Sequence, residues 1–169
     1  MGTVYWITGL SGAGKTTIGK LFYVKMKEKY PNTVFLDGDT LRKVFGDDLG
    51  YSKEDRKKCA IRYSRLCAML QEQGMNVICC TISMFDSVRE WNRLNINNYK
   101  EIYVKASMET LRRRDQKGLY SGITEERQKE VVGIHMDIEV PKQPDLVLEN
   151  DGERMPVEQV EKIFRHCVN

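Results

Sequence analysis

The segment from Gly9 to Thr16 has the residue types and spacing that point most directly to chemistry. It reads Gly-Leu-Ser-Gly-Ala-Gly-Lys-Thr and fits the pattern G-x-x-x-x-G-K-[ST], a loop whose backbone N–H groups surround phosphate oxygens. A short apolar run precedes the loop and a helical pattern follows it, so the helix offers its positive dipole end to the same anion. A chance match in a glycine-rich turn would lack this context. We therefore predict a nucleoside triphosphate site that includes Gly9, Ser11, Gly12, Ala13 and Gly14.

Two side chains of this loop are predicted to act on ATP and Mg²⁺. Lys15 is expected to reach the β- and γ-phosphates, and the hydroxyl of Thr16 is expected to hold Mg²⁺. A switch GTPase shares this loop, but it is expected to carry an N-K-x-D motif as well. That motif is absent, and no D-x-x-G follows a strand in the required place. These observations and the small size favour a kinase.

Asp37-Gly38-Asp39 closes the second apolar run, at the edge of a parallel sheet that faces the ligand crevice. Transfer of phosphate to a hydroxyl needs a carboxylate that orients the hydroxyl and accepts its proton. Asp39 is our candidate for this role, with Asp37 supporting it or reaching Mg²⁺ through water. The alternative is a turn whose aspartates cap a short helix over residues 40–45.

Basic residues follow at positions suited to phosphate binding. Arg42 lies one helical turn after Asp39, Arg56 lies in the first turn of a long helix, and Lys117 opens a glycine-containing segment. Residues 112–114 are three consecutive arginines, a pattern typical of a solvated surface. We nevertheless predict that this run, through Arg112, contributes to the nucleotide site.

Apolar runs of strand length alternate with charged segments of helical period. This alternation predicts an α/β protein with a five-stranded parallel sheet sandwiched by helices, the P-loop nucleoside-triphosphate kinase fold. Ser52 is expected to cap the longest helix and Gly74 to end it. We predict one kinase domain over residues 1–169, with a mobile, partly helical lid near residues 116–143. The predicted strands are 4–8, 33–37, 76–82, 101–105 and 145–148, and the predicted helices are 15–30, 53–73, 86–97, 108–114 and 157–167.

The composition argues against a nucleic-acid partner and a membrane span, and it favours the cytoplasm as the compartment. The 169 residues carry 27 Lys and Arg against 24 Asp and Glu, and a net charge of +3 is too small to indicate a nucleic-acid partner. No apolar run approaches the roughly 18 residues of a membrane span, and no signal-peptide pattern begins the chain. The five cysteines show no paired spacing, which indicates reduced thiols and a cytoplasmic protein. Cys79 and Cys80 are expected to face opposite sides of one strand.

Several motifs together resemble the adenylylsulfate (APS) kinase family, whose patterns read approximately GLSGAGKTT, DGD with a following Arg, LGFS-x-x-DR, ISP and RDPKGLY. This chain offers matching segments at 9–17, 37–42, 49–56, 82–83 and 114–120, and Pro144 to Leu148 closes the set. The resemblance spans nearly the whole chain. It implies a kinase that transfers phosphate from Mg-ATP to the ribose 3′-hydroxyl of adenosine 5′-phosphosulfate, and it allows a homodimer.

Carried over by position, the resemblance implies that Thr17 joins the ATP and Mg²⁺ site and that Asp39 lies near the accepting hydroxyl. Tyr51 stands where the family has a phenylalanine that stacks on the substrate base. The residues predicted to bind the substrate, a small nucleotide, are Asp37, Asp39, Arg42, Tyr51, Arg56, Cys59, Ile82, Ser83, Lys117, Gly118, Leu119 and Val131.

The departures from the family pattern cluster around the base. Val131 replaces a phenylalanine that covers the second face of the adenine, and Cys59 replaces an asparagine near the base. Met84 and Asp86 replace the proline and arginine that follow the ISP serine. Loss of one stacking aromatic costs on the order of 1–3 kcal/mol for a purine. We therefore favour a smaller base in the acceptor.

A branch similar to APS kinases, from bacterial capsule phosphoramidate pathways, acts on cytidine diphosphoramidate. That substrate keeps the ribose and the 5′-linked phosphate but carries a pyrimidine, so it is our favoured acceptor, with APS as the alternative. A shikimate or gluconate kinase disagrees with the Asp37–Asp39 and Lys117–Tyr120 segments. A non-catalytic nucleotide-binding module disagrees with the presence of Asp39, Arg42 and Lys117.

Overall fold

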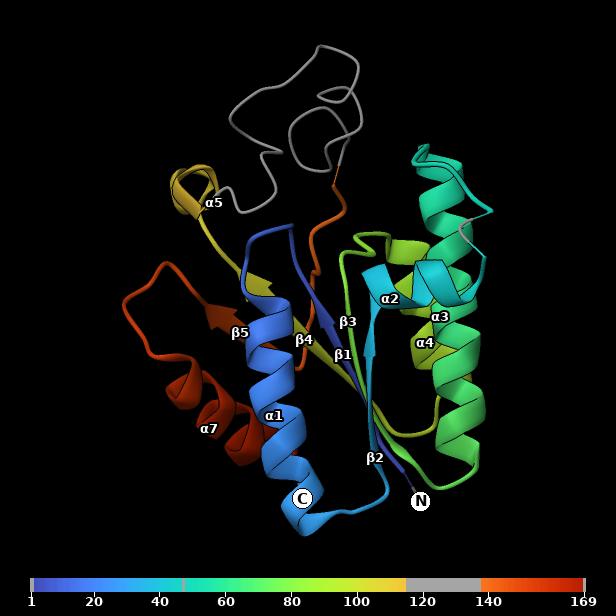
Figure 1. The fold of residues 1–169 in the computed structure, drawn as a ribbon, viewed down its shortest axis with the longest axis horizontal. Coiled ribbons are helices and arrows are strands. Elements are labelled where there is room, and N and C mark those ends of the chain that lie inside the picture. Colours follow the sequence, from blue (N-terminus) through green and yellow to red (C-terminus); the bar gives the residue numbers. More distant parts are fainter. Residues whose placement is uncertain (1, 47, 115–137, 169) are drawn as a thin grey trace.

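The computed structural model describes residues 2–46, 48–114 and 138–168. Their five strands form one parallel sheet, as predicted from the sequence, and the structure gives its strand order as β2-β3-β1-β4-β5 (Figure 1). Because every neighbouring pair is parallel, the carboxyl ends of the strands meet at one edge, where the phosphate loop follows β1. The strands are β1 (Val4–Thr8), β2 (Thr33–Asp37), β3 (Asn76–Thr81), β4 (Tyr99–Lys105) and β5 (Leu146–Glu149).

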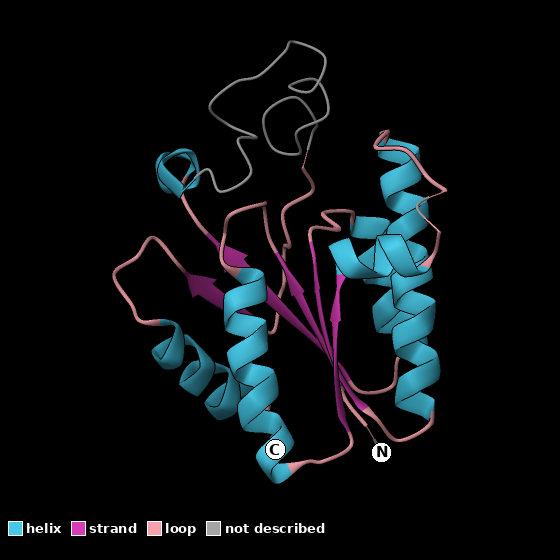
Figure 2. Ribbon diagram, viewed as in Figure 1, coloured by secondary structure: helices cyan, strands magenta, loops and turns pink. Residues whose placement is uncertain are grey.

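Helices cover both faces of the sheet, which gives three layers (Figure 2). One face carries α1 (Lys15–Lys29) and α7 (Pro156–Cys167), and the other carries α2 (Gly38–Val44), α3 (Lys53–Glu72) and α4 (Asp86–Asn95). Within the described residues, the remaining helix is α5 (Met108–Arg114), which follows β4.

Side-chain alternation along the strands divides the core into two clusters. On β1, Tyr5 and Ile7 pack toward α1 and α7, whereas Val4 and Trp6 pack toward α3 and α4. The same alternation places Cys79 in the second cluster and Cys80 in the first, which confirms that the adjacent thiols face opposite sides. All five cysteines are free and buried, and burial raises the pKa of the Cys80 thiol.

The ends of the longest helix are as predicted. The Ser52 hydroxyl accepts a hydrogen bond from the Asp55 N–H at 3.1 Å, and Gly74 has φ +84° just after the helix ends.

Strand ends differ from the prediction by one or two residues. β4 begins at Tyr99 rather than at residue 101 because Tyr99 pairs with Val4 of β1 despite the polar residues beside it. β5 begins at Leu146 because the side chain of Asp145 accepts a hydrogen bond from the Glu101 N–H at 2.8 Å, in place of a backbone ladder bond. The predicted lid lies outside the described residues except for 138–143.

Among the helices that the structure describes, none combines the length and the apolar character needed to cross a bilayer.

Candidate active site

The phosphate loop joins β1 to α1, and one glycine fixes how the helix starts. Gly14 is the N-cap of α1 with φ +100°, a conformation that side chains with a Cβ rarely adopt. A Cβ there would also lie 2.4 Å from Nδ2 of Asn150, the residue after β5. Asn150 Nδ2 donates to the Ala13 carbonyl at 2.7 Å, so a residue distant in sequence supports the loop from behind. Asn150 was not predicted as a site residue, because a single polar residue after a strand carries no motif.

Thr16 and Asp37 meet at the mouth of this loop. The Thr16 hydroxyl donates to Asp37 Oδ2 at 2.9 Å, so the hydroxyl and a carboxylate from the neighbouring element converge. These oxygen donors fit Mg²⁺, which takes one or two protein oxygens and completes its shell with water and phosphate. Lys15 is buried, and its ammonium group donates to the Leu10 carbonyl at 2.7 Å. The lysine therefore folds back over the loop that it belongs to.

Asp37 has a second task at the end of β2. Its Oδ1 accepts a hydrogen bond from the Asp39 N–H at 3.1 Å, so Asp37 is the N-cap of α2. The capping alternative raised from the sequence is therefore correct for Asp37. The same capped turn places Asp39 at the start of α2, where it lines the cleft beside the phosphate loop.

One cleft of about 200 Å³ joins the phosphate loop to the predicted acceptor residues. Gly9 and Ala13 belong to the phosphate loop without lining the cleft. Lys117, Gly118, Leu119 and Val131 lie outside the described residues. The predicted residues that line the cleft are Ser11, Gly12, Gly14, Lys15, Thr16, Thr17, Asp37, Asp39, Arg42, Tyr51, Arg56, Cys59, Ile82 and Ser83.

Tyr51 lies between two arginines at the edge of this cleft. The guanidinium carbons of Arg42 and Arg56 lie 4.4 Å and 5.2 Å from the centre of the Tyr51 ring. Arg42 also donates to the Gly50 carbonyl at 3.0 Å, and Arg56 donates to the Tyr51 carbonyl at 2.8 Å. Both arginines thus shape the loop that carries Tyr51, in addition to the phosphate-binding role predicted from the sequence.

Cys59 and Tyr63 form the part of the cleft that α3 contributes. They are one helical turn apart and share a face of the helix, and both are buried. The Tyr63 hydroxyl donates to the Gly38 carbonyl at 3.1 Å, directly before Asp39, and burial raises the pKa of Tyr63. Its ring stacks on Phe45 with the ring centres 6.1 Å apart. Tyr63 was not predicted as a site residue. Its position four residues after Cys59 on the same helix could have indicated that both face the cleft.

The turn after β3 forms the opposite wall. Ser83 has φ +26°, the one non-glycine residue with positive φ in the described chain, and its hydroxyl lies 2.7 Å from that of Thr81. Met84 and Phe85 follow it and line the cleft, and neither was predicted as a site residue.

Arg112 is exposed and does not line the cleft formed by the described residues, so its contribution to the nucleotide site stays a prediction. Arg114, two residues later at the end of α5, donates to the Gly12 carbonyl of the phosphate loop at 3.4 Å.

The fold and cleft agree with the comparison to known families. The sequence model of the adenylylsulphate kinase family matches residues 1–149. The chain belongs to the adenylylsulphate kinase family. This membership makes it an ATP-using phosphotransferase that acts on a hydroxyl group of a nucleotide.

Relatives of two kinds resemble this family member over almost its whole length. Cytidine diphosphoramidate kinase of Campylobacter jejuni is 41% identical over 162 residues, covering 96% of this chain and 94% of the relative. Adenylyl-sulfate kinase of Paraburkholderia xenovorans is 37% identical over 169 residues, covering 99% and 93%. The structure of the Mycobacterium tuberculosis APS kinase in complex with AMPPNP and APS has a TM-score of 0.85, 32% identity, and coverage of 97% and 96%.

Proposed function

We propose that this kinase transfers the γ-phosphate of Mg-ATP to the ribose 3′-hydroxyl of cytidine diphosphoramidate. The observation that carries the proposal is that the phosphate loop, Asp39 and residues predicted to bind the acceptor, among them Arg42 and Tyr51, line one cleft. A donor phosphate and an acceptor hydroxyl could therefore be bound in the same cleft, as phosphoryl transfer requires.

The residues of the cleft supply each part of the transfer. The 3′-oxygen bonds to the γ-phosphorus as the bond to the bridging oxygen of ADP breaks, and Asp39 orients the hydroxyl and takes its proton. The backbone N–H groups of the loop stabilise the developing charge, together with Lys15 once its ammonium group exchanges the Leu10 carbonyl for the phosphates. Thr16 and Asp37 would hold Mg²⁺, which when bound neutralises charge on the phosphates.

The base-binding region supports a pyrimidine acceptor. Cys59 offers a weak donor where an amide would offer strong hydrogen bonds, and Tyr63 places a ring beside it. The relative at 41% identity is named for the cytidine compound, which supports the same acceptor.

APS is the second candidate acceptor. The relative at 37% identity and the M. tuberculosis structure are both APS kinases. Tyr51 is a half-exposed aromatic residue lining the cleft, and its ring would also stack on adenine if Arg42 or Arg56 moved off the ring face that the base takes.

The deciding experiment measures ADP release by the purified protein with Mg-ATP and either acceptor. We expect kcat/KM for cytidine diphosphoramidate to exceed that for APS by at least about fivefold, the smallest loss expected from one missing stacking contact to a purine. A preference for APS would overturn the choice of acceptor and leave the kinase chemistry standing. No acceptor-dependent ADP release with either compound would overturn the 3′-kinase proposal.

The proposal also covers the metal, the compartment, the biological process and the assembly. We propose Mg²⁺ as the metal, the cytoplasm as the compartment, capsule phosphoramidate synthesis as the process, and a homodimer as the possible assembly. Residues 1–169 would act as one kinase domain, with residues 116–143 as its lid. The donor set at Thr16 and Asp37 supports the choice of metal, and the C. jejuni relative supports the process.

A further inference from the structure

The turn after β3, which forms one wall of the acceptor region, is held by contacts from other elements. The Thr8 hydroxyl, at the end of β1, donates to the Ile82 carbonyl and lies 3.5 Å from the Met84 sulfur. Ser83 keeps a strained backbone between these contacts. A conformation of this kind persists only where its surroundings fix it, so the position of Met84 and Phe85 depends on these neighbours.

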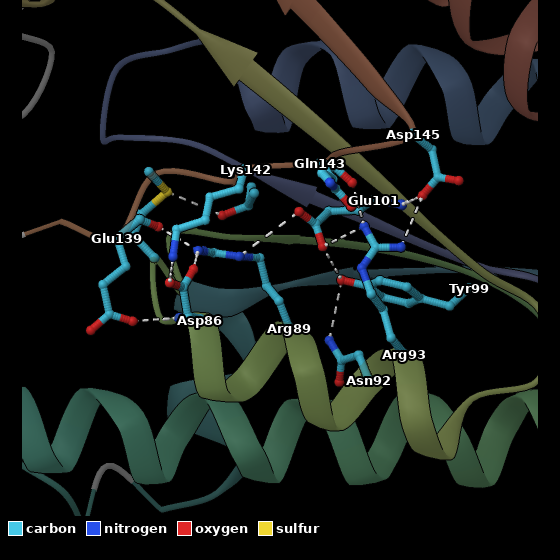
Figure 3. A network of polar contacts seen from close by, with 12 residues as sticks. Asp86, Arg89, Asn92, Arg93, Tyr99, Glu101, Glu139, Lys142, Gln143 and Asp145 are labelled. Atoms are coloured by element: carbon cyan, nitrogen blue, oxygen red, sulfur yellow. Dashed lines mark hydrogen bonds and ion pairs between the residues drawn. The ribbon is translucent and has the colours of Figure 1, made fainter.

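Residues 138–145, which lead into β5, hold the same turn from outside. The Glu139 N–H donates to the Met84 carbonyl at 3.2 Å, and the Glu139 carboxylate accepts a hydrogen bond from the Asp86 N–H. The Lys142 ammonium lies 3.1 Å from the Asp86 carboxylate (Figure 3). Residues 138–145 therefore hold the turn after β3 in place through both backbone and side-chain contacts.

Arg89 joins the turn and the segment beneath their surface. It is 4% exposed, and one nitrogen of its guanidinium donates both to the Glu139 carbonyl and to the Asp86 carboxylate. Its Nε lies 3.8 Å from Glu101, which is 2% exposed. Figure 3 shows Arg89 extending from α4 between Asp86 and Glu101.

A second arginine extends this network toward β5. Arg93 Nη2 lies 3.2 Å from the Glu101 carboxylate and donates to the Gln143 carbonyl at 2.8 Å. Burial raises the pKa of Glu101 even though both arginines oppose that shift. Asp145 closes the network 3.7 Å from Arg93.

The buried pair at the centre of this network, Arg89 and Glu101, is poorly explained as a source of stability. Desolvation of two buried charges offsets much of their attraction, and well-packed apolar residues often replace such pairs without loss. What the network does supply is a fixed geometry between α4, the turn after β3 and residues 138–145. Arg89, Arg93 and Glu101 do not themselves line the cleft of the described residues.

We propose that Arg89 is a positioning residue for the acceptor nucleotide: it fixes the Met84–Phe85 wall by holding Asp86 and the Glu139 backbone in place. This inference rests on the proposed function for the identity of the acceptor side. It assigns Arg89 no role in binding ATP, because the phosphate loop is built from β1, α1 and Asn150.

The first test compares Arg89→Lys with the wild-type enzyme, using cytidine diphosphoramidate and APS as acceptors. Lysine keeps the charge but has a single nitrogen, which cannot lie between Asp86 and the Glu139 carbonyl and also beside Glu101, so we expect the KM for the preferred acceptor to rise about tenfold or more. The KM for ATP should stay at the wild-type value. Lys25→Ala, which removes an exposed ion pair between α1 and α7, is the matched control and should leave both KM values unchanged.

A second variant guards against misfolding. Arg89→Met combined with Glu101→Gln removes both buried charges together, so it leaves neither of them unpaired. We expect this double variant to fold and to show the same selective rise in acceptor KM. Equal rises in the KM for ATP and for the acceptor, in either variant, would overturn the proposal.

Hydrogen–deuterium exchange supplies a readout that needs no acceptor. In Arg89→Lys, amides of residues 84–88 and 138–143 should exchange faster, whereas those of β1 should not change. Unchanged exchange in the turn, or faster exchange throughout the sheet, would overturn the proposal. If the wild-type enzyme phosphorylates neither acceptor, the proposed function fails, and exchange still decides whether Arg89 holds the wall.

Discussion

The two halves of the cleft are built in different ways. The phosphate half comes mainly from consecutive residues 9–17, and its shape follows from backbone geometry at Gly14 and the start of α1. The other half, which we propose binds the acceptor, comes from side chains on three separate segments, with Tyr51 on a loop, Cys59 and Tyr63 on α3, and Phe85 after β3. A site built from backbone N–H groups recognises the phosphates, which all nucleoside triphosphates share. A site built from side chains can change its substrate when a single residue is replaced. Substrate choice is therefore expected to reside in the acceptor half.

Asp39, at the start of α2, lines the cleft with residues of both halves, and its replacement should have the largest effect on turnover. We expect Asp39→Ala to lower kcat by about 10²–10⁴-fold, the usual contribution of a positioned proton acceptor. ATP affinity measured by calorimetry should remain near the wild-type value, because the phosphate loop is untouched. Unchanged ADP release in this variant would remove Asp39 from its proposed role.

Gly14→Ala should damage the phosphate half alone. The φ of +100° costs a residue with a Cβ about 1–3 kcal/mol, and the methyl group would also press on Asn150. We expect ATP affinity to fall about 5- to 150-fold, measured by calorimetry.

The control for this experiment is Gly74→Ala. Gly74 has a similar φ of +84°, but a Cβ there would meet no atom within 4 Å. It should lower the unfolding temperature without weakening ATP binding. A matching loss of ATP affinity in both variants would mean that the effect is one of general stability.

Tyr51→Ala should damage the acceptor half alone. Removal of a stacking ring costs about 1–3 kcal/mol, so the KM for the acceptor should rise about five- to 150-fold while the KM for ATP holds. Tyr51→Phe keeps the ring between Arg42 and Arg56 and should behave like the wild-type enzyme. If the phenylalanine variant loses as much as the alanine variant, stacking is not the function of this ring.

Tyr63→Phe should have the smallest effect and tests how α3 supports Asp39. It removes one hydrogen bond to the Gly38 carbonyl and keeps the ring on Phe45, so kcat should fall about two- to tenfold. Tyr5→Phe is the control, since Tyr5 packs on Phe22 in the other core cluster. Steady-state ADP release that falls equally in both variants would argue against a specific link to Asp39.

The sequence by itself determined the fold class and the phosphate half of the site. Strand-length apolar runs alternating with helical segments leave few alternatives to a parallel sheet, and consecutive residues 9–16 specify a loop with little help from elsewhere. The caps at Ser52 and Asp37 were readable for the same reason, because each bonds to a backbone N–H two or three residues away.

Only the tertiary structure decided which distant side chains meet. Asn150 supports the phosphate loop from the end of β5, Arg114 reaches that loop from the end of α5, and Arg89 fastens residues 138–143 to the acceptor wall. Each of these contacts joins residues at least 50 positions apart, and it depends on strand order and on the angle at which a helix leaves the sheet. Neither the strand order nor the helix angle can be predicted from a short stretch of sequence, because both are set when the two core clusters pack on opposite faces of the sheet.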